Sequence, residues 1–295
     1  MAVGGQVYTY PDVARRESLL DAVNMLDPTD TQLLSGLKQG TANNTLHEWI
    51  QESLETVGDN AQAEGADAPA DTSGDPVRVQ NVTQIFSKTA RISGSETADA
   101  LKRVGGNRMQ RELTKKMKAL KNDTEFALLR GTIASGVASS SAASARRLKG
   151  VKAFVSTNNV NYSGVSLTET ILNDLFELSW NQGANIDAVY TPMKGKRRIS
   201  AFTAGATKNV DLNDRRLVNA VNVYESDAAK LVKIFPHRHV TISGDYGTTA
   251  TPGFDVLALQ EDTWATAFYR KPFKKAVASV GDYEAQQLLH ELTLE

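Results

Sequence analysis

The sequence contains no cysteine and only four histidines among its 295 residues. The missing cysteines exclude disulfides, thiolate metal sites and cysteine nucleophiles. No stretch approaches the roughly 18 consecutive apolar residues of a membrane-spanning helix. The first twelve residues also lack the basic start and apolar run of a signal peptide. We therefore expect a soluble chain that is neither exported nor inserted into a membrane.

A basic excess is also missing, because 33 lysines and arginines face 34 acidic residues and the net charge is -1. A dedicated nucleic-acid-binding protein normally carries a clear positive charge, so any contact with a polyanion must be local. Hydrophobic residues make up 41% of the chain and charged residues 23%, which is typical of a globular protein. A chain of this length forms one large or two ordinary domains.

The common catalytic motifs do not occur either. Gly131 and Gly136 have the spacing of a phosphate-binding loop, but Val137 and Ala138 replace the lysine and hydroxyl residue that it needs. The dinucleotide motif GxGxxG, the nucleophile motif GxSxG and the zinc motif HExxH are absent from the sequence. We expect no enzymatic activity and no cofactor.

The four histidines do not form a recognisable metal motif. His237 and His239 would face the same side of a predicted strand, but no third ligand stands at a useful spacing. We interpret this pair as the polar end of a hairpin and expect no metal site. His47 and His290 lie within predicted strands, where we expect paired polar groups.

Residues 107–131 predict one long helix. Asn107 is a good N-cap and Gly131 suits the left-handed C-cap position. At 1.5 Å per residue the helix would be about 37 Å long. Spacings of three and four give one apolar stripe, formed by Met109, Leu113, Met117, Leu120, Ala127 and Leu128. The opposite face is cationic and carries Arg108, Arg111, Glu112, Lys115, Lys116, Lys118 and Lys121. Such a face is ordinarily exposed to solvent. Alternatively, it contacts a partner.

The chain before this helix predicts an arm and a projecting hairpin. Residues 1–45 alternate short apolar runs with proline and glycine, and Thr29 or Asp30 is the expected cap of a short helix. Residues 46–54 and 77–93 read as strands. Between them, residues 58–76 hold five acids and no base, with nothing more apolar than alanine. Because a lone two-stranded hairpin is marginal in water, we expect another subunit to support it.

The chain after the long helix predicts a compact α/β unit followed by returning strands. We expect a strand over 148–157 and a helix over 167–182, capped by Ser166 or Thr168. The buried face of that helix is predicted as Leu167, Ile171, Leu175 and Leu178. Further strands are expected at 187–191 and 218–225, a basic helix at 194–202, and a hairpin of 230–235 with 240–243 around Pro236. The end is all strand, at 256–259, 263–269, 274–280 and 284–294, and should cover the long helix. On the last strand, Leu288, His290, Leu292 and Leu294 would share a face.

Two basic clusters could contact phosphate. The first lies in residues 146–152 and the second in residues 194–198. Neither is interleaved with the aromatic residues that stack on nucleic-acid bases. A solvated helix face is the simpler interpretation of the second cluster, and the first has the same alternative.

The order of these parts resembles the tailed-bacteriophage major capsid (major head) protein family with the Hong Kong 97 fold. The resemblance rests on a succession of stretches in order along nearly the whole chain: DPTDTQLLSGL (27–37), NTLHEW (44–49), EGADA (64–68), TQIFSKTARISG (83–94), ELTKKMKALKNDTEFALL (112–129), ARRLKGV (145–151), LTETILND (167–174), RRISAFT (197–203), VNVYESD (221–227) and GDYEAQQLLHELTLE (281–295).

The resemblance implies an α+β fold whose parts can be assigned along the chain. Residues 1–45 would be the N-terminal arm and 46–94 the extended β-hairpin loop, with its acidic tip at 58–76. The peripheral domain would take residues 95–164, with the spine helix at 107–131, and the returning strands at 259–295. Residues 165–258 would form the compact α/β axial domain.

The resemblance also implies a structural role. The chain would self-assemble as hexamers and pentamers into an icosahedral shell around packaged double-stranded DNA, in the virion and, before that, in the host bacterial cytoplasm. Portal, scaffolding and possible decoration proteins would be its other partners. Some relatives carry a fused scaffolding segment before the arm, and too few residues stand there in this chain. Scaffolding is therefore expected from a separate protein, or from a segment that has already been removed. No lysine lies between Gln51 and Ser87, so the covalent crosslinking of some relatives is not expected.

The charges suggest where subunits meet. We hypothesise that the acidic tip of one subunit docks near the cationic helix face of the next. The candidate contacts are Asp59, Glu64, Asp67, Asp71 and Asp75 on the tip, and Arg108, Arg111, Lys115 and Lys118 on the helix. Alternatively that face looks inward at packaged DNA. Two other functions stay open: a nucleic-acid-binding protein that uses the two basic clusters, and a hydrolase with a non-standard site.

Overall fold

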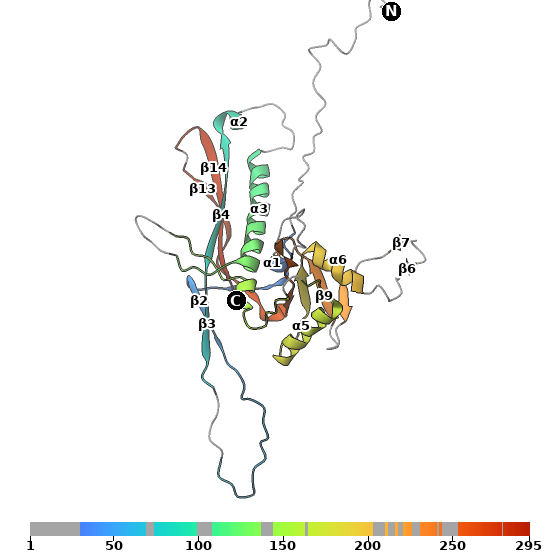
Figure 1. The fold of residues 1–295 in the computed structure, drawn as a ribbon. Coiled ribbons are helices and arrows are strands. Elements are labelled where there is room, and N and C mark those ends of the chain that lie inside the picture. Colours follow the sequence, from blue (N-terminus) through green and yellow to red (C-terminus); the bar gives the residue numbers. More distant parts are fainter. Residues whose placement is uncertain are drawn as a thin grey trace, which may run out of the picture.

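Two four-stranded sheets organise the structure, a computed structural model, and a thin hairpin projects away from them (Figure 1). The structure describes residues 30–68, 74–98, 108–136, 144–162, 165–202, 210–211, 216–217, 221–225, 231–240, 242–243, 253–278 and 280–295. The predicted helix cap Thr29 and the predicted strand residues 218–220 lie outside these ranges.

The first sheet joins the two ends of the described chain. Its strands, in spatial order, are β1 (Lys38–Thr41), β13 (Ala265–Val277), β14 (Tyr283–Leu294) and β4 (Gln84–Ser93). β1 runs parallel to β13, and the other neighbours are antiparallel. The C-terminal strands therefore pair with strands from the first third of the sequence.

The predicted long helix is present as α3 (Arg108–Arg130) and packs on β4 and β14. One core joins Leu120 and Leu128 of α3 to Phe86 of β4 and Leu292 of β14. The predicted stripe is buried only in the second half of the helix, since Met117 is 49% exposed. That half is also covered by α1 (Gln32–Gly36), α4 (Val151–Phe154) and β5 (Ala188–Thr191), which contribute to the same core.

The second sheet has the order β12 (Leu257–Leu259), β5, β9 (Leu231–Pro236) and β8 (Val223–Glu225). Its core includes side chains from α5 (Glu169–Asn181) and α6 (Met193–Phe202). Thr168 caps α5 as predicted, because its hydroxyl accepts a hydrogen bond from the Ile171 backbone N–H at 3.3 Å.

The predicted buried face of α5 is wrong. The structure buries Leu172, Phe176 and Ser179, whereas the predicted residues Leu167, Ile171, Leu175 and Leu178 are only half-buried. The helix carries apolar residues on two adjacent stripes, each with helical spacing. Periodicity cannot choose between two such stripes, and the position of the second sheet decides.

Several predicted strands are also wrong. The predicted strand at 77–93 is two strands, β3 (Val77–Val82) and β4, and 148–157 contains the short helix α4. The predicted hairpin around Pro236 does not form, because β10 (Ile242–Ser243) pairs with β11 (Gly253–Phe254), and β9 pairs with β5 and β8. The remaining elements are β2 (Leu46–Gln51), α2 (Gly94–Ala98), β6 (Val210–Asp211), β7 (Arg216–Leu217) and the 3-10 helix η2 (Glu261–Thr263).

β13 is one long strand where two were predicted. Its pairing with β14 is irregular between Arg270 and Phe273, which brackets Pro272. β1 pairs with β13 only as far as Phe268, so Pro272 lies where β13 is the outer strand. Proline is tolerated there because its missing N–H removes no bond from a central ladder.

His290 of β14 makes a buried polar contact between the first sheet and α3. It is 4% exposed and stacks on Phe86 with ring centroids 5.0 Å apart. Its Nε2 lies 2.9 Å from the hydroxyl of Thr124, which donates its own proton to the Leu120 carbonyl. The hydroxyl oxygen therefore accepts the hydrogen on Nε2. Burial lowers the pKa of His290 to about 4.

We predict that His290 makes the free energy of unfolding fall between pH 6.5 and 4. In that window the unfolded histidine binds a proton and the folded one does not, so its contribution of about 3 kcal/mol is complete above the window and lost toward its lower end. His290→Gln keeps an N–H donor but cannot titrate. Urea unfolding at about pH 7.5 and about pH 5 should show a smaller loss of stability in the variant. Equal losses in both proteins would contradict the prediction.

Candidate assembly interface

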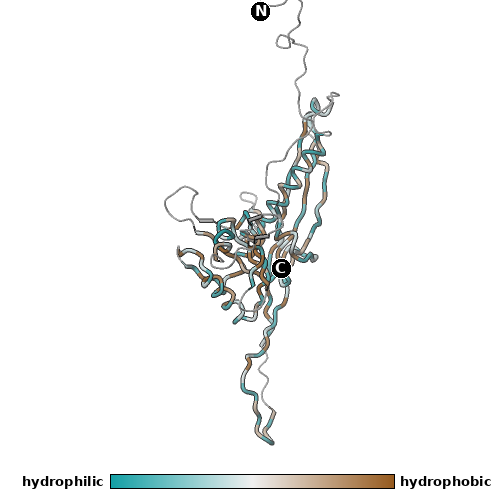
Figure 2. The backbone as a smooth tube through the Cα atoms, turned by 90° about the vertical axis from the view of Figure 1, so that its right-hand side faces the viewer, coloured by the Kyte–Doolittle hydropathy of each residue, from teal (hydrophilic) through white to brown (hydrophobic). Residues whose placement is uncertain are grey.

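The hairpin of β2 and β3 extends beyond the two sheets, and both views of the chain show it (Figures 1 and 2). Past Gln51, residues 52–68 are all exposed, and Leu54 and Val57 are each 98% exposed. Ile50 and Val77, at the ends of the paired strands, are also exposed. A two-stranded ribbon cannot bury these side chains by itself. The hairpin is therefore the part of the subunit that most lacks a covering surface.

Glu291 of β14 holds the base of this hairpin. The carboxylate is 1% exposed, and its Oε1 accepts hydrogen bonds from the Thr83 hydroxyl and from Arg146 Nη2, both at 2.7 Å. Its Oε2 accepts from Arg270 Nε at 2.8 Å. Thr83 lies between β3 and β4, at the point where the predicted single strand divides. Before it, β3 pairs with β2, and after it, β4 pairs with β14. A buried acid with two arginines satisfies the requirement that buried charges be paired.

Asn81 of β3 is the second anchor and is fully buried. Its Nδ2 donates to the carbonyl of Leu294 at 2.7 Å and to that of Lys149 at 3.1 Å. Its Oδ1 accepts from the backbone N–H groups of Val82 and Lys149, each at 2.8 Å. The amide thus ties the hairpin to β14 and to the chain that follows α3.

The structure does not bring the predicted acidic and basic residues together within one subunit. Asp59, Glu64, Asp67 and Asp75 lie exposed on the loop of the hairpin, while Asp71 lies outside the described residues. The loop and the first turns of α3 stand at opposite ends of the molecule (Figure 1). Any contact between them has to join two subunits.

The cationic face of α3 follows helical spacing. Arg108, Arg111, Lys115 and Lys118 are separated by three, four and three residues, which places them on one side of the helix. Arg108, Lys115 and Lys118 are exposed and Arg111 is half-buried. Arg108 also lies 3.5 Å from Glu112, one turn away. These four side chains form a cationic stripe about 15 Å long, from the rise of the helix.

The first basic cluster is largely used inside the subunit. Arg146 binds the buried Glu291, Lys149 lies 4.3 Å from the centre of the Phe154 ring, and Lys152 lies 2.5 Å from Asp255. These contacts engage three of the four basic side chains of the cluster, and Arg147 is exposed.

The second basic cluster belongs to α6. Lys196 donates to Asn222 at 2.8 Å and to the carbonyl of Ile234 at 3.3 Å, which holds the helix against the second sheet. Lys196 therefore holds α6 in place. The exposed residues of this cluster are Arg197 and Arg198.

Glu125 is a buried acid that the sequence did not single out. It is 0% exposed on α3, and it accepts hydrogen bonds from the backbone N–H groups of Leu33 and Leu34 at 2.7 and 2.8 Å. His237 Nε2 lies 2.7 Å from the same carboxylate. The N-cap of α1 is Thr31, not the predicted Thr29 or Asp30, and its side chain makes no capping bond. The carboxylate of Glu125 serves in place of that cap.

The two histidines predicted to face one side of a strand instead follow β9 in a turn. Their rings are 5.7 Å apart, and the backbone N–H of His239 donates to His237 Nδ1 at 3.1 Å. Burial lowers the pKa of His239. Within the described part of the chain, no group of three or more His, Asp or Glu side chains is placed to hold a metal. Likewise, no described helix combines the length and apolar character needed to cross a membrane.

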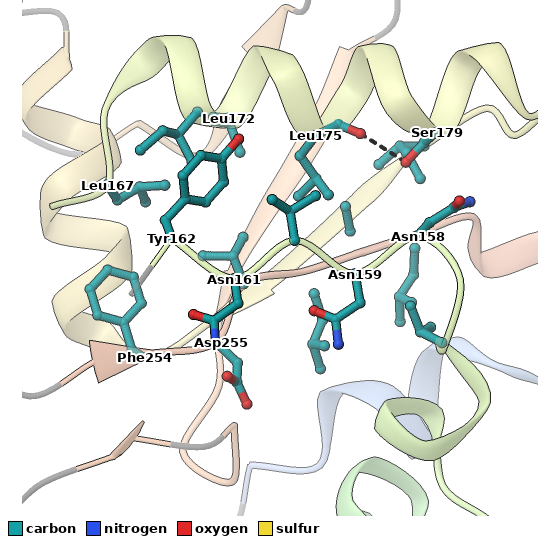
Figure 3. A pocket seen from close by; sticks show the side chains of 18 of the residues that line it. Asn158, Asn159, Asn161, Tyr162, Leu167, Leu172, Leu175, Ser179, Phe254 and Asp255 are labelled. Carbon is teal, nitrogen blue, oxygen red and sulfur yellow. Dashed lines mark hydrogen bonds between the residues drawn. The ribbon is translucent and has the colours of Figure 1, made fainter. Parts of the chain in front are cut away.

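A cavity of about 900 Å³ lies between α5, residues 158–162 and the strands around β12 (Figure 3). Leu175 of α5 and Leu167, which precedes that helix, line it, and both were predicted to be buried. The Ser179 hydroxyl donates to the Leu175 carbonyl at 2.9 Å, so its proton is used within the helix. Ser179 is therefore not arranged as an activated nucleophile for the hydrolase alternative.

We predict that Glu291→Leu destabilises the chain by about 3 kcal/mol, because it leaves Arg146 and Arg270 without their carboxylate. The estimate is at the low end for a broken buried pair, since both arginines keep some contact with solvent. Glu284→Gln, an exposed change on the same strand, is the control and should cost less than about 0.5 kcal/mol. Chemical denaturation measures both. Equal stability of the two variants would rule out an anchoring role for Glu291.

The chain matches the SU10 major capsid protein family over residues 3–295. One curated relative, the major capsid protein of Escherichia phage Phieco32, is 33% identical over 125 residues. That alignment covers 42% of this chain and 35% of the relative, so the match spans about a third of the relative's length.

Three solved structures share the fold. A structure from Microbacterium phage Oxtober96 matches with a TM-score of 0.59 at 12% identity, covering 95% of this chain and 90% of that one. The capsid of a native GTA particle gives 0.60 at 11%, covering 96% and 91%. The holo-SrpI encapsulin complex of Synechococcus elongatus PCC 7942 gives 0.59 at 10%, covering 96% and 88%.

At such identities the likeness concerns the fold alone, and that fold is the α+β Hong Kong 97 fold of phage capsids, as the sequence predicted. The family match rests on the sequence and spans nearly the whole chain. On this match, the chain belongs to the SU10 major capsid protein family.

Proposed function

We propose that this chain is the shell-forming subunit of a tailed-phage head. It assembles as hexamers and pentamers into an icosahedral shell that encloses double-stranded DNA, first in the host bacterial cytoplasm and then as part of the virion. The observation that carries this proposal is the projecting hairpin, whose Leu54 and Val57 are almost completely exposed. The described part of the chain leaves them uncovered, a neighbouring molecule would bury them, and many such contacts add through multivalency.

The domain division follows from the same proposal. The arm is 1–45, the extended loop 46–94, and the axial domain 165–258, which contains the second sheet. The peripheral domain combines 95–164 and 259–295, with α3 as its spine. Portal, scaffolding and decoration proteins are the further partners in this proposal, and the role is structural, without catalysis.

The acidic loop of one subunit docks on the cationic stripe of a neighbour in this proposal. The two surfaces carry opposite charge and cannot meet within one chain. Each exposed ion pair contributes only about 0.2–1 kcal/mol. Three of them in every contact are enough to change the subunit concentration at which shells form by about tenfold, which corresponds to about 1.4 kcal/mol.

The test is assembly of the triple variant Asp67→Asn, Asp71→Asn, Asp75→Asn across a salt series, followed by light scattering and electron microscopy. At low salt we expect the variant to need about tenfold more subunit than the unchanged protein. High salt screens the pairs, so the difference should shrink as salt rises.

A matched control carries the same change of charge elsewhere: Glu177→Gln, Asp262→Asn and Glu284→Gln, all at exposed positions. It should assemble like the unchanged protein. Assembly of the loop variant that equals the control at every salt concentration would sink the docking contact and leave solvent or packaged DNA as the alternatives for the stripe. A protein that stays monomeric at all concentrations would sink the shell itself.

A further inference from the structure

Glu125 accepts hydrogen bonds from two separate parts of the chain. One part is the arm segment, defined here as residues 30–41, which contains α1 and β1. Its Leu33 and Leu34 N–H groups reach Oε1 and Oε2 at 2.7 and 2.8 Å. The other part is the turn after β9, from which His237 Nε2 reaches Oε1 at 2.7 Å. Oε1 therefore serves both parts at the same time.

The orientation of His237 is fixed by its own neighbours. The backbone N–H of His239 donates to Nδ1 at 3.1 Å, so Nδ1 carries no hydrogen and Nε2 carries one. The hydrogen on Nε2 points at Glu125. The ring is 4% exposed and lies edge-on to Tyr190, with ring centroids 6.0 Å apart. Both the imidazole and the carboxylate are thus shielded from water.

The arm segment also touches the chain beside the second sheet, at the 3-10 helix η2 and at the turn after β9. Lys38 Nζ donates to the carbonyl of Asp262 at 2.7 Å, and Arg238 lies 3.7 Å from Asp30. A Cβ on Gly36 would lie 3.5 Å from Oε1 of Glu261. The arm segment therefore lies between α3 and one end of the second sheet.

A buried carboxylate is tolerated only while donors surround it. If the arm segment leaves, Glu125 keeps His237 alone and faces a large desolvation penalty. If His237 leaves, the buried carboxylate loses one of its donors, so less of the cost of burying it is offset and its position beside the N–H groups of α1 becomes less favourable. Each part is therefore more stable in place when the other is in place.

We propose that Glu125 is a positioning residue that couples the arm segment to the second sheet. Release of one loosens the other, so a neighbour that pulls on the arm also shifts the turn at His237 and the end of β9. The coupling is a property of the single chain and does not depend on the shell proposal.

Hydrogen exchange on the full-length, unassembled chain tests it. His237→Leu removes the donor, and we expect the Leu33 and Leu34 amides to exchange at least tenfold faster. His237→Gln places an amide N–H where Nε2 was, so exchange at these amides should stay within about threefold of the unchanged protein, given the usual scatter of conservative changes.

The reverse direction is tested with Leu33→Ala, which loosens α1 in the core and should speed exchange at residues 237–240. Leu172→Ala, in the separate core of the second sheet, is the control for a general loss of stability. If His237→Leu changes exchange at Leu33 and Leu34 no more than Leu172→Ala does, or if His237→Gln is as damaging as His237→Leu, the coupling through Glu125 is overturned. Both comparisons remain valid when a variant lowers overall stability, because Leu172→Ala shows how much such a loss changes exchange.

Discussion

The carboxylate of Glu125 is the interaction on which the centre of the subunit depends. A fully buried charge requires donors, and here they come from the start of α1 and from the end of β9. The same region packs Leu33, Leu128 and Leu129, each with no exposed surface. The apolar core supplies the larger share of the free energy there, and the carboxylate determines which parts of the chain are adjacent.

Glu291 plays a similar part on the first sheet. It gathers the base of the hairpin, the segment after α3 and the irregular part of β13 around one anion. Each of the two buried acids binds donors from separate parts of the chain. Such groups cost stability unless all their bonds form, so they favour one arrangement of these parts over others.

Much of the fold could be predicted from periodicity. The length of α3, the cap at Thr168 and the C-terminal strand have regular patterns, and the structure confirms them. Periodicity could not identify Glu125, Glu291 and Asn81, because the sequence does not distinguish a buried polar residue from a solvated one. Glu125 lies in a helix rich in charge. Glu291 lies among the leucines at the end of β14, and that was the available signal.

The wrong predictions share a cause. The burial of α5 and the pairing of β9 depend on which surface arrives from a distant part of the chain. Local pattern does not contain that information, since α5 offers two apolar stripes and β9 could have paired with the segment that follows it. Burial is likewise unequal along α3, because α1, α4 and β5 cover only the second half of the helix.

The passage from β3 through Thr83 into β4 also has a mechanical meaning. β4 runs antiparallel to β14 over ten paired residues, from Gln84 opposite Leu292 to Ser93 opposite Tyr283. A force applied to the hairpin acts along β4, and the ladder bonds lie across that direction. They are loaded in shear, so they share the force instead of breaking one after another. A force on the hairpin is therefore carried jointly by the ladder bonds between β4 and β14.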